Sequence, residues 1–178
     1  MRRLLLSLCT VLLFGFHTSA QADGLVKELK LGVLDHDTDG LWSGFNREGG
    51  IDFNAEIILN HDLAFWGGVM SPALGLSVNS QGDTSKAYLD ARWQTDLSDN
   101  IFFALGVGAA VHNGNNKLTN VNRKALGSKA LFHFPLELGY QIDERYSISL
   151  FFDHVSNAWT SSPNEGMDTL GIRFGYRF

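Results

Sequence analysis

Hydrophobic and polar residues alternate with a period of two along much of the chain. In residues 101–111 every second residue is apolar, and most of the residues between them are Ala or Gly. Successive side chains of a strand point to opposite faces of its sheet, so this period predicts strands with one apolar face. Eight such strands are predicted, at residues 25–34, 51–59, 69–79, 86–96, 101–111, 130–140, 146–152 and 170–178.

The segments between these strands alternate in length. Long polar loops are expected at residues 35–50, 79–85, 113–123 and 157–167, and shorter turns at 60–68, 96–100 and 141–145. Strands of about ten residues, joined by long loops at one end and short turns at the other, are typical of outer-membrane barrels. The last strand ends on Phe178, and such terminal aromatic residues resemble the assembly signal of these barrels. We therefore predict an all-β fold, an eight-stranded antiparallel transmembrane β-barrel.

A soluble eight-stranded barrel of the lipocalin type is the structural alternative. It needs its apolar side chains inside, and an eight-stranded barrel has too little interior room for this many aromatic residues. In the predicted membrane barrel, a set of charged residues instead shares the inner face, where its members can pair: Glu56, Asp90, Arg92, Glu137 and Arg173.

The beginning of the chain is typical of a secretory signal peptide. Two arginines precede an apolar run at residues 4–16, and an Ala-Gln-Ala cleavage site ends at Ala22. We expect residues 1–22 to be removed, leaving 23–178 as a single barrel domain. The one cysteine of the chain leaves with the signal, so disulfide and thiol chemistry are not expected of the mature protein.

The charge balance is acidic, with 14 Lys and Arg residues against 19 Asp and Glu residues. A chain without a basic patch cannot neutralise many phosphates, so a nucleic-acid partner is not expected. Residues 35–40 imitate the start of an EF-hand, but its twelfth position is Asn46 and not the required Glu. Gly106 and Gly108 lie within a strand and indicate a narrow barrel interior better than a dinucleotide loop. No metal and no cofactor are expected.

Three residues with the chemistry of a nucleophilic site lie around the last long loop. His154 and Ser156 continue the outward parity of residues 146–152, and Asp168 has the outward parity of the last strand. A hairpin folded about Ser161 sets Asp168 opposite His154. A serine needs an adjacent base to take its proton, and that base needs a third group to orient it. The simpler interpretation is a set of solvated loop residues; the combination of residue types favours a triad on the outer wall.

The same stretch resembles the lipid A 3-O-deacylases (PagL family). The similarity rests on His154-x-Ser156-Asn157-Ala158 and Pro163-Asn164-x-Gly166-x-Asp168, followed by the aromatic final strand. It implies an eight-stranded serine esterase of the bacterial outer membrane, which removes the 3-linked acyl chain of lipid A. Its partners would be lipopolysaccharide and outer-membrane lipid.

The resemblance also implies roles for individual residues. Ser156 would be the nucleophile and His154 the general base. The third member is often Glu in the family and is matched here by Asp168, with Glu165 as the reserve candidate. Three further residues would support the oxyanion: Asn157, Asn164 and the backbone around Gly166. Their alternative role is to form the turn.

Two further groups of loop residues have two possible roles each. Trp42 and Trp159 are expected at the lipid interface, or packed within the loops. Lys117, Arg123 and Lys124 are candidates to meet lipid A phosphates, although scattered cations are more often simply solvated.

Functions of other classes stay open from the sequence alone. The chain fits a structural or adhesive barrel without activity, and also another outer-membrane lipase or acyltransferase. A monomer and a homodimer are both compatible with it.

We predict that the mature chain begins at Asp23. Intact-mass measurement and N-terminal sequencing of the protein purified from a secreting host should find this residue first. A mature protein that retains residues 1–22, or starts elsewhere, would contradict the proposed Ala22 site.

Overall fold

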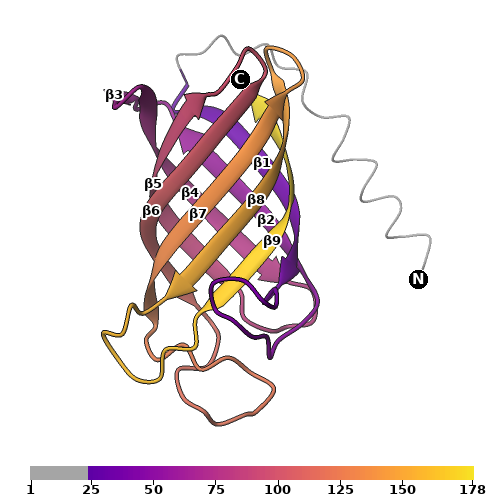
Figure 1. The fold of residues 1–178 in the computed structure, drawn as a ribbon, viewed down its shortest axis with the longest axis vertical. Helices are drawn as coiled ribbons and strands as arrows, with labels where there is room; N and C mark the ends of the chain where they lie inside the picture. The colour runs from indigo at the N-terminus through magenta and orange to yellow at the C-terminus, as the bar shows by residue number, and fades with distance from the viewer. Residues whose placement is uncertain (1–23) are drawn as a thin grey trace, which may run out of the picture.

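The computed structural model describes residues 24–178, and the expected signal peptide lies outside this range. Its strands are β1 (Val26–His36), β2 (Ile51–Leu59), β3 (Leu63–Phe65), β4 (Gly68–Asn79), β5 (Lys86–Asp96), β6 (Ile101–His112), β7 (Ala130–Gln141), β8 (Tyr146–Ser156) and β9 (Met167–Arg177). All eight long strands stand side by side around one barrel, whereas β3 is a short extension beside β4 (Figure 1).

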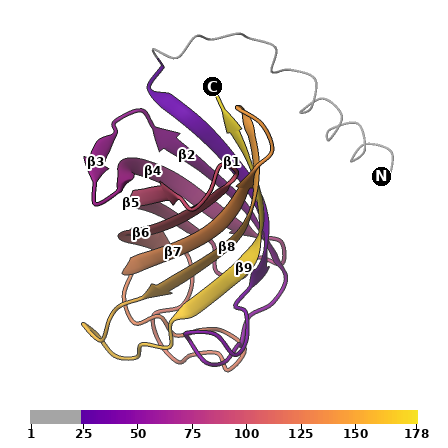
Figure 2. The same ribbon diagram turned by 45° about the horizontal axis from the view of Figure 1, so that its top comes forward.

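Antiparallel pairing closes the wall of the barrel. Strand β1 pairs with both β2 and β9, and β2 also pairs with β4, which brings the first and last parts of the sheet together. Figure 2 shows the strands curling around a common axis, with the long loops gathered at one end. We call this the loop end and the opposite one the turn end. The predicted eight-stranded antiparallel barrel is confirmed.

Two boundaries differ from the sequence prediction by three residues or more. Strand β8 continues four residues beyond residue 152, and β9 begins before residue 170, because the polar residues there remain paired across the two strands. The expected turn at 60–68 contains β3. Side chains of β5 hold it in place: the indole of Trp93 donates to the carbonyl of Phe65 at 2.8 Å.

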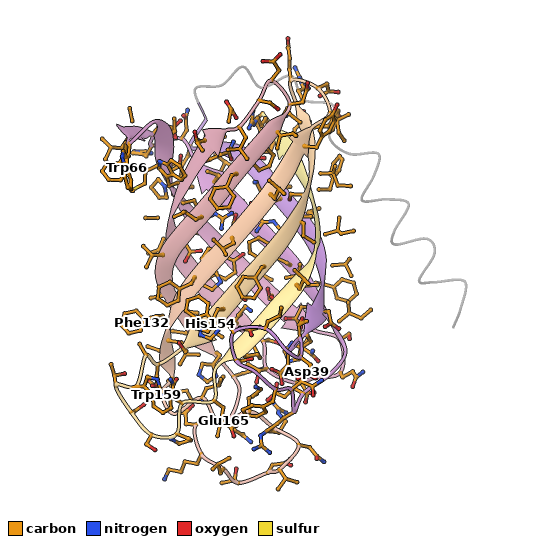
Figure 3. All side chains as sticks on the ribbon, in the orientation of Figure 1. Asp39, Trp66, Phe132, His154, Trp159 and Glu165 are labelled. Atoms are coloured by element: carbon orange, nitrogen blue, oxygen red, sulfur yellow. The ribbon has the colours of Figure 1, made fainter. Side chains whose placement is uncertain are left out.

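Apolar side chains cover the outside of the barrel. Leu31, Val33, Leu150 and Ile172 are each more than half exposed, while their neighbours along the strands are mostly buried. Figure 3 shows side chains projecting outward all around the wall of the barrel. An apolar outer band around a polar interior is the arrangement of a transmembrane barrel, so the lipocalin alternative is wrong. Among residues 24–178, helices long and apolar enough to cross a bilayer are absent.

Ion pairs fill the middle of the interior. Glu137 accepts hydrogen bonds from Lys30 at 2.9 Å and from Arg92 at 2.6 Å, and Arg173 donates to Glu56 at 2.6 Å. All five side chains are at least 95% buried. The predicted pairing of charges on the inner face is confirmed for this group. Buried charges are tolerated when they are paired and hydrogen-bonded, as these are.

The interior near the loop end combines a second charged group with an apolar cluster. His133 lies 2.9 Å from Asp90, and Lys86 donates to Asp153 at 2.5 Å. Gly108 faces this group, and a Cβ there would clash with the Asp90 carboxylate, which explains the small residue. The apolar cluster joins strands and one loop: Tyr88, Ala110, Leu126, Leu131, Val155 and Met167.

We predict that Glu137→Ala destabilises the barrel by about 3–5 kcal/mol, because it leaves buried cations without their carboxylate. Urea unfolding in detergent, followed by heat-modifiable gel migration, would measure the loss. Glu144→Ala is the matched control, since Glu144 lies exposed in a turn, and we expect its effect to stay within about 0.5 kcal/mol. Equal effects of the two substitutions would contradict the interior network.

Candidate active site

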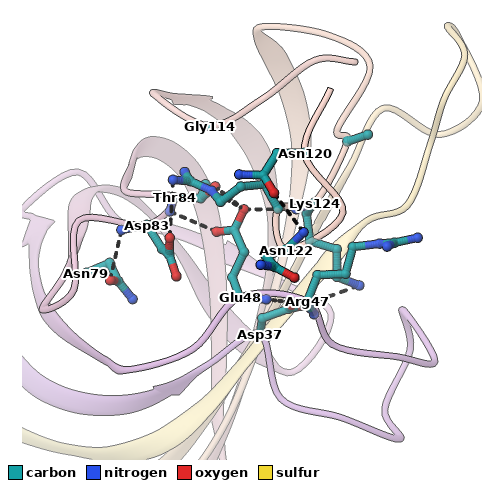
Figure 4. A network of polar contacts seen from close by, with 12 residues as sticks. Asp37, Arg47, Glu48, Asn79, Asp83, Thr84, Gly114, Asn120, Asn122 and Lys124 are labelled. Atoms are coloured by element: carbon teal, nitrogen blue, oxygen red, sulfur yellow. Dashed lines mark hydrogen bonds and ion pairs between the residues drawn. The ribbon is translucent and has the colours of Figure 1, made fainter. Parts of the chain in front are cut away.

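Four loops meet at the loop end: L1 (37–50), L2 (80–85), L3 (113–129) and L4 (157–166). The carboxylate of Glu48 lies at their centre (Figure 4). It accepts hydrogen bonds from the backbone and hydroxyl of Thr84 at 2.8 and 3.0 Å, from Arg123 at 3.0 Å and from the backbone of Lys124 at 2.9 Å. His36, at the end of β1, lies 3.1 Å away. One buried carboxylate therefore joins L1, L2, L3 and the barrel wall.

The electrostatics of this loop hub follow from its burial. Burial alone would raise the pKa of Glu48, but the hydrogen bonds from His36, Thr84 and Lys124 outweigh it and lower the pKa to about 2. Asp37 accepts hydrogen bonds from the backbone of Arg47 and Glu48, yet burial still raises its pKa. Glu48 is thus charged at neutral pH and holds its partners by charge-assisted hydrogen bonds.

Two cations of L3, Arg123 and Lys124, belong to the loop hub. Lys124 is fully buried, 3.3 Å from Asp37 and over the ring of Phe45. Arg123 bridges Glu48 and Asp83. The expectation that Lys124 contacts lipid A phosphates is therefore wrong, because its buried ammonium group pairs with Asp37. For Arg123, which is partly exposed, phosphate contact stays a prediction.

Glu165 connects L4 to the same hub. Its carboxylate pairs with Arg47 of L1 at 3.0 Å and accepts the backbone N–H of Ala125 of L3 at 2.7 Å. These contacts direct the carboxylate toward L1 and L3, and among the described residues it makes no hydrogen bond to His154.

His154 and Asp168 lie directly opposite each other on β8 and β9, in the register expected for a hairpin folded about Ser161. Nδ1 of His154 is 2.6 Å from one carboxylate oxygen of Asp168. The other oxygen accepts the backbone N–H of Ser43 at 2.6 Å. Asp168 is fully buried and His154 is 4% exposed, so the pair is largely shielded from solvent although it belongs to the outer face.

Ser156 lies two residues beyond His154 on the same face of β8. Both line a pocket of about 370 Å³ at the rim, together with Phe134 of β7 and residues of L1 and L4. Within the described chain the Ser156 hydroxyl makes no hydrogen bond to His154. Catalytic hydrogen bonds are often long before substrate binds, and rotation about one side-chain bond moves this oxygen.

The three residues expected to support an oxyanion have different roles. Both side-chain N–H groups of Asn157 donate to carbonyls, of Leu126 and Pro163, so this side chain anchors L4. Its backbone N–H donates to the side-chain oxygen of Asn164 at 2.9 Å. The amide nitrogen of Asn164 donates to no protein acceptor among residues 24–178, and Asn164 lines the pocket.

Gly166 packs against the imidazole of His154. It has a φ of +64°, and a Cβ there would lie 3.0 Å from Cε1 of His154. Both the backbone conformation and the lack of room therefore favour glycine at this position.

Trp42 contacts the site in a way that the sequence did not indicate. Its ring stacks on His154 with 4.3 Å between centroids and 13° between planes. Trp42 and the backbone of Ser43 come from L1, far from His154 in the chain, and their contacts have no local sequence signal. Trp159 is 81% exposed at the same rim (Figure 3).

The family model of the lipid A 3-O-deacylases (PagL) matches residues 30–177. The chain belongs to the PagL family. Over 87 residues it is 30% identical to the lipid A deacylase PagL of Bordetella bronchiseptica, a match that covers 49% of this chain and 46% of that protein. The chain thus spans about half the length of that curated relative. The family resemblance read from the sequence is confirmed.

Solved structures agree on the fold. The crystal structure of the outer membrane enzyme PagL has a TM-score of 0.62 at 15% identity, over 84% of this chain and 99% of that one. A de novo designed transmembrane β-barrel has a TM-score of 0.50 at 8% identity, over 86% of this chain and 97% of the design. At these identities the likeness concerns the barrel architecture alone.

We predict that Glu48→Gln loosens L1 and L3 without opening the barrel. Hydrogen exchange followed by mass spectrometry should show faster exchange in both loops at pH 7, and unchanged exchange in the strands. Glu144→Gln, in an exposed turn at the other end, is the control.

The pH dependence of the same variant follows from the lowered pKa of Glu48. Its contribution is complete above about pH 4.5, the ordinary value, and is lost as the pH falls through about 2. The difference between wild type and Glu48→Gln, corrected for intrinsic exchange, should persist at pH 5 and shrink only toward pH 2. A difference that vanishes already at pH 5 would contradict a charged hub.

Proposed function

We propose that the protein hydrolyses the 3-O-linked acyl ester of lipid A in the outer leaflet of the bacterial outer membrane. Ser156 is the nucleophile, His154 the general base and Asp168 the orienting acid. The observation that carries this proposal is the buried His154–Asp168 pair, at 2.6 Å, sharing a pocket on the outer wall with Ser156 in a chain of the PagL family.

The hydrogen bond between His154 and Asp168 assigns the imidazole tautomer. Asp168 accepts from Nδ1–H, which leaves Nε2 of His154 as the base. Nε2 takes the Ser156 proton as its oxygen attacks the ester carbonyl. The imidazolium then returns this proton to the leaving sugar 3-oxygen, leaving an acyl-serine. Water, deprotonated by the same nitrogen, attacks the acyl-serine, and the fatty acid is released as Ser156 regains its proton.

The tetrahedral intermediate needs donors aimed at its oxyanion. The amide nitrogen of Asn164 is the side-chain donor at the pocket, together with the backbone around Gly166. Asn157 acts through Asn164, because its backbone N–H holds the Asn164 oxygen and thereby turns the NH₂ group to the other side.

The position of the pocket suits an ester of a membrane lipid. The outer wall on the strand side of the pocket is apolar, whereas the loops on its other side are polar and charged. Long loops face the extracellular side in bacterial barrels, so the pocket lies at the level of the outer leaflet. An acyl ester reaches the pocket without leaving the membrane. All three residues come from one chain, so the proposed reaction does not require a homodimer.

We predict that Ser156→Ala and His154→Ala each lower deacylation by roughly 10³-fold or more, while heat-modifiable migration shows an intact barrel. Asp168→Asn should retain more activity, because nucleophile and base remain. Mass spectrometry of lipid A incubated with refolded protein measures the loss of one 3-linked acyl group. The double variant Ser156→Ala/His154→Ala should lose little more than either single variant, since the triad acts as a unit.

Glu165→Gln is the comparison for the acid, since the two residues are close in the chain and differ in their contacts. We expect a mild effect. A severe Glu165→Gln defect beside a nearly normal Asp168→Asn would reassign the acid. Wild-type activity in Ser156→Ala would refute the proposed mechanism, and transfer of the acyl chain to another lipid would indicate an acyltransferase.

A further inference from the structure

Two consecutive residues of L1 contact both partners of the His154–Asp168 pair. The indole of Trp42 stacks on the imidazole, and the N–H of Ser43 donates to the oxygen of Asp168 that does not face His154. Trp42 and Ser43 are the central residues of a tight turn, closed by a hydrogen bond from the N–H of Gly44 to the carbonyl of Leu41 at 3.2 Å. The turn thus presents a ring and a donor at fixed separation.

Contacts on several sides fix the plane of the His154 ring. Asp168 holds Nδ1, Trp42 covers one face and Gly166 packs near Cε1. Phe134, directly opposite His154 on β7, lies with its ring centroid 6.5 Å away. Of these contacts, the Trp42 stack comes from outside the β7–β9 sheet and its connecting loop. Its loss would free the ring to tilt.

The hub prevents this turn from swinging away. On one side of the turn, the N–H of Thr38 donates to the backbone carbonyl of Asp168 at 2.9 Å. On the other side, the N–H groups of Arg47 and Glu48 donate to the carboxylate of Asp37. Both ends of L1 are therefore attached to buried groups, and the turn between them is held over the site.

Trp42 is 62% exposed, so a role in core packing does not explain why a tryptophan occupies this position. An exposed Trp at the rim of a barrel also has the chemistry of a lipid anchor. The two roles differ in what they change. An anchor affects the binding of lipid, whereas a ring that fixes the imidazole affects the proton transfer from Ser156, whatever the acyl donor is.

We propose that Trp42 is a positioning residue for the reaction, acting through His154 by stacking on its imidazole, while the Ser43 N–H orients Asp168. The inference rests on the proposed function, because it assigns the parts of L1 to the same site. Displacement of catalytic groups by about 1 Å costs up to about 10²-fold in rate, so a contact of this kind matters without touching substrate.

The test uses the full-length barrel with Trp42→Leu and Trp42→Phe, and with Trp66→Leu as control. Leu keeps an apolar surface for lipid without an aromatic face, and Phe restores the face. Trp66 is 86% exposed at the turn end, away from His154 (Figure 3). Two readouts are needed: kcat and KM for lipid A in mixed micelles, and the rate at which a small fluorophosphonate labels Ser156, with Ser156→Ala as the blank. The small probe has no long acyl chain to anchor.

We expect Trp42→Leu to lower kcat by about 10- to 100-fold with KM within about twofold, and to slow labelling by a similar factor. Trp42→Phe should recover most of both rates, and Trp66→Leu should match wild type. Heat-modifiable migration checks that every variant folds. A raised KM with unchanged kcat and labelling would show a lipid anchor and overturn the proposal. Equal defects in Trp42→Leu and Trp42→Phe would overturn it too.

Failure of the proposed function gives a different result. A folded wild-type barrel that neither deacylates lipid A nor labels at Ser156 would refute the triad and, with it, the role of Trp42. A wild type that deacylates and labels beside fully active Trp42 variants would refute only the role of Trp42.

Discussion

Closure of the barrel is the constraint on which the rest of the structure depends. Strand β9 must pair with β8 on one side and with β1 on the other, so its register is determined twice. A slip of one residue would turn every side chain of β9 to the opposite face. Arg173 would then leave the ion pairs of the interior, and Asp168 would leave His154. The charged interior and the outer-wall pair are therefore two consequences of a single register.

The loop hub holds L1 in contact with the His154–Asp168 pair at the rim of the barrel. Strand ends alone would leave His154 and Asp168 open to water and to lipid. L1 covers them only because its ends are attached to buried carboxylates, Asp37 and Glu48, whose partners come from L2 and L3. Glu165 adds L4 to the same assembly. Charged residues of the loops thus hold L1 over the pocket.

Features that depend on residues close together in the chain were predicted from the sequence, and features that depend on contacts between distant residues were not. The period of two is a local property, so it predicted the eight strands and the outward parity of His154, Ser156 and Asp168. The two L1 contacts of the site, the stack of Trp42 and the N–H of Ser43, join residues distant in the chain and depend on the path of a loop. The same holds for Lys124, whose neighbours in sequence do not reveal that Asp37 will neutralise it. The short strand β3 was missed because its three residues, paired with β4, are too few to show a period of two.

The presence of Asp rather than Glu at position 168 fits the position of L1 over the pocket. Directly opposed residues of two antiparallel strands have Cβ atoms about 4.5–5.5 Å apart, a gap that the short side chain of Asp spans to reach Nδ1 of His154. Its second oxygen then ends at the Ser43 N–H, 2.6 Å away. A Glu there would carry its oxygens one methylene further and would need the turn of L1 to stand further from the wall. The Asp side chain and the close approach of Trp42 and Ser43 are thus matched, and a longer acid would be accommodated only with a different path of L1.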